Sequence, residues 1–245
     1  MKRITLALFV LFCSVWAVQA AELVVATDTN FPPFEYKDPQ TGEHVGFDVE
    51  LWDTIAKETG LEYKLQPMAF KGIVPGLQAG QIDVGIAGMS ITDERKKTID
   101  FSDGYYDSGL LLLVAADSPI KGIADLNGKK VATKTGSTSV DFLKENAPEA
   151  ELALFPNDNA MFMELMTGGV DAVFFDKPVV ESFVNKGGNG KVQVVGELYA
   201  GQPYGIGFPK GSALVDKVNA SLKKIKEDGR YAALYEKWFG AAPQN

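Results

Sequence analysis

The chain alternates short runs of apolar and β-branched residues with longer stretches in which apolar residues recur at helical spacing. Leu23–Thr27 has the composition of a buried strand, and residues 47–59 place Phe47 and Leu51 on one face of a helix that ends at Gly60. Strands that alternate with helices favour α/β units with mostly parallel sheets. On such sheets ligands bind at the carboxyl ends of the strands, so residues that follow strands are the candidates for a site.

The alternation continues along the chain without tandem repeats or low-complexity tracts. Further strands are expected near Phe34–Tyr36, His44–Val45, Glu62–Gln66, Asp83–Ala87, Leu110–Val114, Lys130–Thr133, Ala153–Phe155, Ala172–Phe175, Val192–Val194 and Tyr204–Phe208. Helices are expected around residues 73–79, 138–146, 158–167, 177–186 and 212–228, and from Tyr231 to Trp238. The first two of these strands are expected to pair as a hairpin.

The N-terminal residues have the pattern of a cleaved secretory signal. Lys2 and Arg3 precede an apolar run, Ile4–Val18, which is followed by small and polar residues. This run is shorter than the roughly 20 residues that span a bilayer, which disfavours a membrane anchor. Cys13 follows a large residue, whereas a lipoprotein attachment site needs a small one. We therefore expect residues 1–20 to be removed and the mature protein to be water-soluble in the periplasm.

Charge and composition exclude several classes of function. The chain has 24 Lys and Arg against 32 Asp and Glu, a net charge of −8, and removal of residues 1–20 makes the chain still more acidic. Such a surface repels phosphate backbones, so nucleic-acid binding is not expected. One His and one Cys leave little material for a metal site or a Ser/His/Asp triad, and we expect neither metal nor cofactor. A mature chain without Cys suits an oxidising compartment.

One candidate binding residue follows the expected strand at Asp83–Ala87. Thr92 is a good N-cap, and Arg95 lies one turn into the helix that it would begin. A guanidinium there offers a planar fork that matches a carboxylate. Spacing alone slightly favours the alternative, a surface arginine paired with Asp93 or Glu94.

Other polar residues also follow strands. Lys134–Ser139 runs from a strand into a helix, whose backbone N–H groups would form an anion site, although the spacing is not that of a Walker A loop. Asp28 and Asp176 follow apolar strands and could either cap helices or face a cleft. Together with Arg95, an acid in the cleft would suit a zwitterion. Apolar walls could come from Phe31, Phe34 and Phe70, although core packing is the usual role of phenylalanine.

Several motifs, in order along the whole mature chain, resemble the periplasmic amino-acid-binding proteins of ABC importers. They are Ala26–Glu35 (ATDTNFPPFE), Gly46–Leu51 (GFDVEL), Ile91–Arg95 (ITDER), Ile99–Ser102 (IDFS), Gly104–Tyr106 (GYY) and Lys237–Gly240 (KWFG). Within this family the chain is most similar to the glutamine-binding members, through Asp83, residues 93–97, residues 101–106 and Lys134.

The resemblance implies a type II periplasmic-binding-protein fold, with two α/β lobes that close on a ligand. The two mixed, mostly parallel sheets would be joined by two crossovers near residues 105–109 and 200–204. The large lobe would comprise residues 21–106 and 203–245, and the small lobe residues 107–202. The implied function is to bind an amino acid, as a monomer without catalysis, and to deliver it to an ABC permease in the inner membrane.

The resemblance also implies roles for individual residues. Arg95 would clamp the ligand's α-carboxylate, helped by the Ser90 amide and by backbone amides near Thr138 and Ser139. Asp176 would pair with the α-ammonium, and the Gly88 carbonyl and the Ser90 hydroxyl would complete its bonds.

The remaining implied contacts concern the ligand's side chain. Phe31 and Phe70 would enclose it, and Ala87 lies in the same loop as Gly88. Asp28 would accept from a terminal NH2 group and Lys134 would donate to the carbonyl, a combination that suits glutamine and disfavours both acidic and basic side chains.

Two positions depart from the glutamine-binding pattern. Phe175 stands where that pattern has His, and Thr138 stands where it has Gly. These departures leave another polar amino acid open as the ligand. A dehydratase-like enzyme on the same scaffold and a sensing module for a membrane receptor are the alternatives from other classes.

Overall fold

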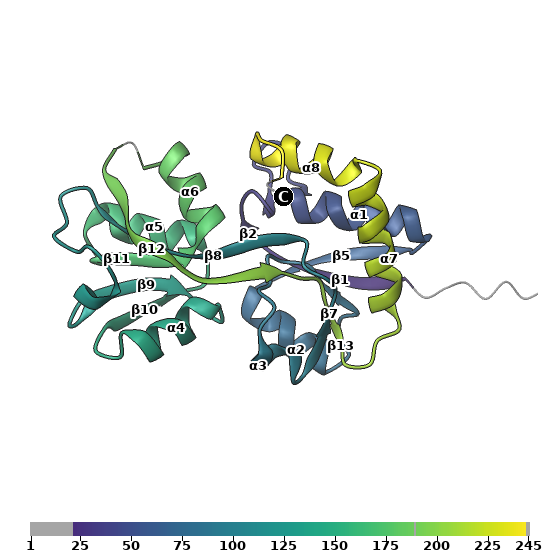
Figure 1. The fold of residues 1–245 in the computed structure, drawn as a ribbon, viewed down its shortest axis with the longest axis horizontal. Coiled ribbons are helices and arrows are strands. Elements are labelled where there is room, and N and C mark those ends of the chain that lie inside the picture. Colours follow the sequence, from purple (N-terminus) through teal and green to yellow (C-terminus); the bar gives the residue numbers. More distant parts are fainter. Residues whose placement is uncertain (1–21, 189, 244–245) are drawn as a thin grey trace, which may run out of the picture.

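The chain folds into two lobes, and each lobe is built around a five-stranded sheet (Figure 1). The computed structural model describes residues 22–188 and 190–243, so the expected signal at residues 1–20 lies outside the described residues. The strand order is β5-β1-β6-β13-β7 in one sheet and β10-β9-β11-β8-β12 in the other. Within the described residues, no helix has the length and apolar character needed to cross a membrane.

The first lobe carries both early and late segments of the chain. Its main sheet contains β1 (Leu23–Asp28), β5 (Tyr63–Met68), β6 (Val84–Gly85), β7 (Ile99–Phe101) and β13 (Gly207–Pro209). A small sheet contains β2 (Asn30–Phe31), β3 (Glu35–Lys37) and β4 (His44–Val45), and the pairing of β3 with β4 confirms the expected hairpin. The helices are α1 (Phe47–Thr59), η1 (Phe70–Gly72), α2 (Ile73–Gln78), α3 (Asp93–Lys96), α7 (Leu214–Glu227) and α8 (Arg230–Phe239).

The second lobe is built from the middle of the chain. Its sheet contains β8 (Tyr106–Ala115), β9 (Lys130–Lys134), β10 (Glu151–Phe155), β11 (Ala172–Asp176) and β12 (Val192–Tyr204). Its helices are η2 (Ile123–Leu126), α4 (Thr138–Asn146), α5 (Asp158–Thr167) and α6 (Lys177–Lys186). In the first lobe Figure 1 shows α1 and α8 on one side of the sheet and α2 and α3 on the other, so both faces are covered.

Both sheets are mixed and mostly parallel, as the sequence predicts. In the first sheet only β13 is antiparallel to its neighbours, β6 and β7, and in the second only β8 is antiparallel to its neighbours, β11 and β12. Each of these two antiparallel strands lies next to a segment in which the chain crosses from one lobe to the other. The parallel strands β1, β6, β9 and β11 therefore end towards one region between the sheets, where strand-end residues of both lobes can meet.

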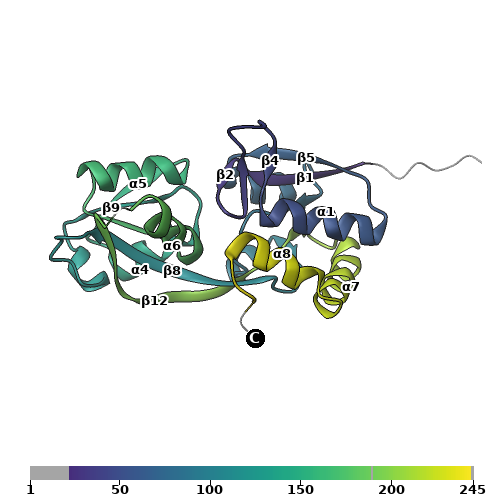
Figure 2. The ribbon, with the colours of Figure 1, turned by 90° about the horizontal axis from the view of Figure 1, so that it is seen from above.

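The two crossovers are the ends of long antiparallel strands (Figure 2). β8 and β12 remain paired from Tyr106 opposite Tyr204 to Ala115 opposite Val192, with register shifts on either side of Tyr199. The strands predicted at 110–114 and 192–194 are too short, because β8 begins at Tyr106 and β12 continues to Tyr204. Irregular pairing near Tyr199 breaks the apolar alternation but not the hydrogen-bonded ladder. Tyr204 was predicted to begin the following strand, whereas it ends β12.

Aromatic side chains continue the core of the first lobe to the crossovers. Phe34 is fully buried and packs at 5.4 Å between ring centroids on Tyr204, at the end of β12. Phe47, at the start of α1, packs on Phe34 at 6.0 Å and on Phe239 of α8 at 5.2 Å. Phe34 therefore belongs to the core that supports the hinge and does not contribute a cavity wall.

Replacing Gly46 with alanine is expected to destabilise the first lobe severely. Gly46 precedes α1 with φ of 141°, and a Cβ atom built there lies 2.0 Å from the Phe34 carbonyl oxygen. At Gly60, with φ of 67°, a Cβ atom built in the same way has no heavy atom within 4 Å apart from those of its chain neighbours. We expect Gly46→Ala to lower the free energy of unfolding by about 3 kcal/mol or more, and the control Gly60→Ala by about 1–2 kcal/mol. Urea unfolding measures both, and equal losses would contradict the steric account.

Candidate ligand-binding site

A cavity with about 270 Å³ of empty space lies between the lobes, near the carboxyl ends of β6, β9 and β11. The first lobe contributes Phe31, Phe70, Ala87, Gly88, Ser90 and Arg95 to its lining. The second lobe contributes Lys134, Ser137, Thr138, Phe175 and Asp176.

The structure brings nine of the eleven residues expected from the sequence to this cavity. The other two, Asp28 and Ser139, are buried directly behind the lining, where Asp28 contacts Lys134 and Ser139 contacts Ser137. Ser137 was missed as a lining residue although it lies in the Lys134–Ser139 motif. Phe175 was noted only as a departure from a pattern, and it forms part of the wall.

Arg95 presents its guanidinium to the cavity from the first turn of α3. The Thr92 hydroxyl caps this helix by accepting from the Arg95 backbone N–H at 3.1 Å. Nη1 donates to the Ser90 carbonyl at 2.8 Å, and Nη2 donates across the lobes to the Gly136 carbonyl at 3.3 Å. The guanidinium also lies 5.4 Å from the centre of the Phe70 ring.

The surface ion pair considered for Arg95 is not formed. Asp93 and Glu94 instead pair with Lys96 and Lys97 on the outside of the same helix. Burial lowers the pKa of Arg95, and nearby Asp176 opposes this effect. An arginine remains charged in any protein, so a cation without an ion-pair partner among the described residues lines the cavity.

Asp176 brings a carboxylate to the same cavity from the end of β11. The hydroxyl of Tyr204 donates to its Oδ2, and Ser108 Oγ donates to the Tyr204 oxygen at 2.9 Å. Both partners belong to the crossover strands, so the hinge orients this acid. Burial raises the pKa of Asp176 to about 6. The cavity thus has a buried acid and a half-buried guanidinium, which complement the two charges of a zwitterion.

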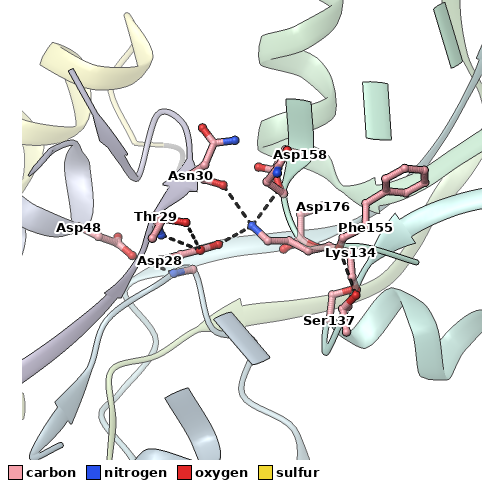
Figure 3. Close-up of polar contacts among 12 residues, drawn as sticks. Asp28, Thr29, Asn30, Asp48, Lys134, Ser137, Phe155, Asp158 and Asp176 are labelled. Carbon is pink, nitrogen blue, oxygen red and sulfur yellow. Dashed lines mark hydrogen bonds and ion pairs between the residues drawn. The ribbon is translucent and has the colours of Figure 1, made fainter. Parts of the chain in front are cut away.

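Lys134 forms a buried polar cluster that joins the lobes (Figure 3). Its ammonium donates to Asp28 Oδ2 and, at 3.1 Å, to the Asn30 carbonyl, both in the first lobe. In its own lobe it lies 2.9 Å from Oδ1 of Asp158. Lys134, Asp28 and Asp158 are at most 2% exposed. We call these four residues, Asp28, Asn30, Lys134 and Asp158, the Lys134 cluster.

The charges in the Lys134 cluster shift one another's titration. Burial alone would lower the pKa of Lys134, but Asp158 and Asp28 raise it above its ordinary value. Burial raises the pKa of Asp158 to about 7, against the opposing effect of Lys134. Asp158 was not predicted from the sequence, because it is an acid in the first turn of a helix and no sequence pattern links it to β9.

Aromatic rings enclose the cavity beside the Lys134 cluster. The rings of Phe31 and Phe175 meet edge to face with 6.0 Å between centroids. The Lys134 ammonium lies 5.1 Å and 5.8 Å from these two ring centres. Such cation–π contacts help to hold the ammonium in place.

A second pair of buried acids supports the loop at Gly88. Asp48 Oδ2 accepts from the Gly88 N–H at 2.8 Å and from the Tyr105 hydroxyl at 2.7 Å. Asp48 Oδ1 and both oxygens of neighbouring Glu35 lack a donor among the described residues. One shared proton would join Asp48 Oδ1 to one oxygen of Glu35, in keeping with a Glu35 pKa raised well above its ordinary value by burial and by Asp48. These acids connect the cavity loop with the hinge.

The ligand-free protein is expected to lose stability as the pH rises from 5 to 8. Burial raises the pKa of Asp48, Asp158 and Asp176 to between about 6 and 7, so the folded state holds protons that the unfolded chain has released. Each unit of raised pKa corresponds to about 1.4 kcal/mol of stability lost above the folded pKa. The lowered pKa of His44 acts in the opposite direction over part of this range.

Urea unfolding at pH 5, 6.5 and 8 measures this effect. The free energy of unfolding should fall across the series, and Asp158→Asn should flatten the slope because it removes one of the titrating groups. A free energy that rises steadily from pH 5 to 8 would show that these acids are not protonated preferentially in the folded state.

Comparisons with known proteins agree in fold and in family. The family model described as bacterial extracellular solute-binding proteins, family 3, matches residues 23–241. The ABC transporter glutamine-binding protein GlnH of Bacillus subtilis (strain 168) is 42% identical over 224 residues, which cover 89% of this chain and 81% of that protein.

Two solved structures extend the comparison. An ancestral arginine-binding protein bound to glutamine is 45% identical, with a TM-score of 0.85 and coverage of 91% of this chain and 100% of that one. The ancestral amino acid-binding protein AncCDT-1, a precursor of cyclohexadienyl dehydratase, is 40% identical, with a TM-score of 0.82 and coverage of 89% and 95%. The expected two-lobed α/β fold is therefore confirmed.

Proposed function

We propose, from the premise that the chain belongs to the bacterial extracellular solute-binding proteins of family 3, that its ligand is L-glutamine. The chain is an amino-acid-binding protein of the ABC-transporter type. In this proposal the ligand is held between the lobes and then delivered to the importer's membrane permease. The glutamine-binding relative in Bacillus subtilis, at 42% identity, supports this choice, and another polar amino acid is the alternative.

The observation that carries the proposal is the pair of opposite charges that line one cavity. Among the described residues the Arg95 guanidinium donates only to backbone carbonyls, and Asp176 accepts from an uncharged hydroxyl. An α-carboxylate would give Arg95 a bidentate partner, with further N–H donors at the start of α4 beside Thr138. An α-ammonium would give Asp176 its missing cation. An amino acid would thus compensate both charges at once.

Hinge closure follows from the division of these groups between lobes. Arg95 and Phe70 would hold the ligand on the first lobe, and Asp176 would reach it only when the second lobe closes. A ligand that binds the closed arrangement better shifts the equilibrium towards it. The Arg95–Gly136 bond and the Lys134–Asp28 ion pair, which span the lobes, would form in the same step.

The wider assignment includes localisation and organisation. The family is extracytoplasmic, and we propose a periplasmic monomer released from a signal at residues 1–20. We assign residues 21–106 and 203–245 to the large lobe and 107–202 to the small lobe. These lobes meet at the crossover strands described above.

Binding is tested on residues 21–245 after unfolding and refolding, which removes any carried-over ligand. Ligand at 100 times its dissociation constant stabilises by about 2.7 kcal/mol, which raises the melting temperature by a few degrees. We expect L-glutamine to give the largest shift in a panel of the twenty amino acids. A larger shift with another amino acid would replace glutamine while keeping the clamp, and no shift with any would refute amino-acid binding at this site.

The two clamp residues are expected to be essential for binding. Arg95→Ala and Asp176→Ala should each weaken glutamine binding by at least 100-fold, because each leaves a ligand charge buried without its partner. Lys96→Ala, which removes an exposed cation from the same helix as Arg95, is the matched control and should bind like wild type. Titration calorimetry measures all three, and near-normal affinity in either clamp variant would contradict the assignment.

A dehydratase-like activity is the second candidate. Asp176 lines the cavity with a pKa raised to about 6, as a general acid requires, and a precursor of cyclohexadienyl dehydratase is among the similar structures. We expect no loss of water from a cyclohexadienyl substrate, because the Asp176 carboxylate is assigned to the ligand's ammonium. Turnover that disappears in Asp176→Asn would favour the enzyme.

A further inference from the structure

Protein groups already surround the ammonium of Lys134. A lysine ammonium has three donors. In this structure it donates to Asp28 and to the Asn30 carbonyl, and it forms an ion pair with Asp158 at 2.9 Å (Figure 3). The expected role of Lys134, donation to a ligand's side-chain carbonyl, therefore competes with these three protein groups.

The second carboxylate also changes the charge beside the cavity. Lys134 with Asp28 alone would be neutral, but Asp158 adds a negative charge when it is ionised, and all three side chains are at most 3% exposed. Solvent screens such buried charges poorly. Neither carboxylate oxygen of Asp158 has a hydrogen-bond donor among the described residues, so its charge is compensated only by the ion pair with Lys134.

Asp158 is not needed to cap its own helix. The N-cap of α5 is Asn157, whose side-chain oxygen accepts from the Ala160 N–H at 3.0 Å. Burial of an acid at this position is costly unless it is compensated. Among the described interactions, the ion pair with Lys134 is the one that compensates the charge of Asp158. Lys134 in turn lines the cavity.

We infer that Asp158 is a specificity-determining residue of the ligand site, acting through Lys134. This inference rests on the proposed amino-acid-binding function and deepens it by naming the class of side chain. By pairing with Lys134 and leaving the ionised cluster negative, Asp158 favours α-amino acids whose side chains end in N–H groups. Amide and guanidinium side chains belong to this class, and side-chain carboxylates are disfavoured.

Arginine thereby becomes an acceptable ligand beside glutamine, contrary to the expectation that Lys134 would repel it. A neutral Lys134–Asp28 pair with a free donor would favour a carbonyl or carboxylate oxygen. The cluster with Asp158 attracts a guanidinium and repels a second carboxylate. Glutamine, being uncharged, is the ligand least sensitive to this change.

The test compares three ligands, L-glutamine, L-arginine and L-glutamate, by titration calorimetry on wild type and Asp158→Asn. The asparagine keeps the shape and can still accept from Lys134, but it removes the charge. In Asp158→Asn we expect the affinity for arginine to fall by roughly tenfold relative to that for glutamine. We expect the affinity for glutamate to rise by a similar factor relative to that for glutamine. Asp158→Glu, which restores the charge, should retain the wild-type ranking. Glu145→Gln, an exposed charge removal in the same lobe, should change none of the ratios.

The pH dependence of selectivity gives a second readout. The charged groups around Asp158 are Lys134 on β9, Asp28 on β1 and Asp176 on β11. Asp176 faces the ammonium that all three ligands share. The effect of its titration therefore cancels when the affinities for two ligands are expressed as a ratio. In wild type the preference for arginine over glutamate should grow from pH 6 to pH 8 as Asp158 ionises. In Asp158→Asn this dependence should largely disappear.

Each outcome decides for or against the inference. Equal weakening of all three ligands in Asp158→Asn, with selectivity still dependent on pH, would mean that the residue is only structural and would overturn it. Unchanged affinities would overturn it as well. Wild-type protein that binds none of the three would instead refute the proposed function, so the two failures are distinguishable. If Asp158→Asn fails to fold, the pH series on wild type decides, and a flat arginine-to-glutamate ratio overturns the inference.

Discussion

A buried ion pair between Lys134 and Asp28 connects two halves of a molecule that otherwise have separate sheets. Charges removed from water are stable only with close partners, so this contact requires the lobes to come together in one arrangement. The hinge strands make that arrangement reachable, because β8 and β12 are paired along their length and also support Asp176 through Tyr204. In the proposed mechanism, closure and the geometry of the cavity both depend on this interlobe contact.

The same arrangement explains why the cavity suits an amino acid. Asp176 is buried and Arg95 is half-buried, and neither has a full charge partner within the protein. A zwitterion would supply both missing partners, so in the proposed mechanism binding and closure favour each other. The Lys134 cluster differs because its ammonium is already paired within the protein. In the same mechanism it contributes to closure for any ligand and influences the ligand's side chain mainly through its net charge.

Most of the fold could be predicted from local patterns in the sequence, and most of the candidate site from the family resemblance together with the rule that site residues follow strands. Apolar runs such as Leu23–Thr27 define strands, and candidate residues follow those strands. The exact extent of β12 could not be predicted, because pairing with β8 continues through an irregular stretch. Asp158 could not be predicted either, because its importance arises from contact with Lys134, which a folded sheet brings close. The Glu35–Asp48 pair was missed for the same reason.

The central claim, that an amino acid supplies the charges that close the lobes, is tested most directly by a distance between them. The mature chain lacks Cys if residues 1–20 are removed, so Asp93→Cys in α3 and Lys144→Cys in α4 provide unique sites for spin labels. Double electron–electron resonance on refolded, ligand-free protein should give a broad distribution at longer distance. Addition of L-glutamine should give one narrower distribution at shorter distance. Identical distributions with and without ligand would contradict the account.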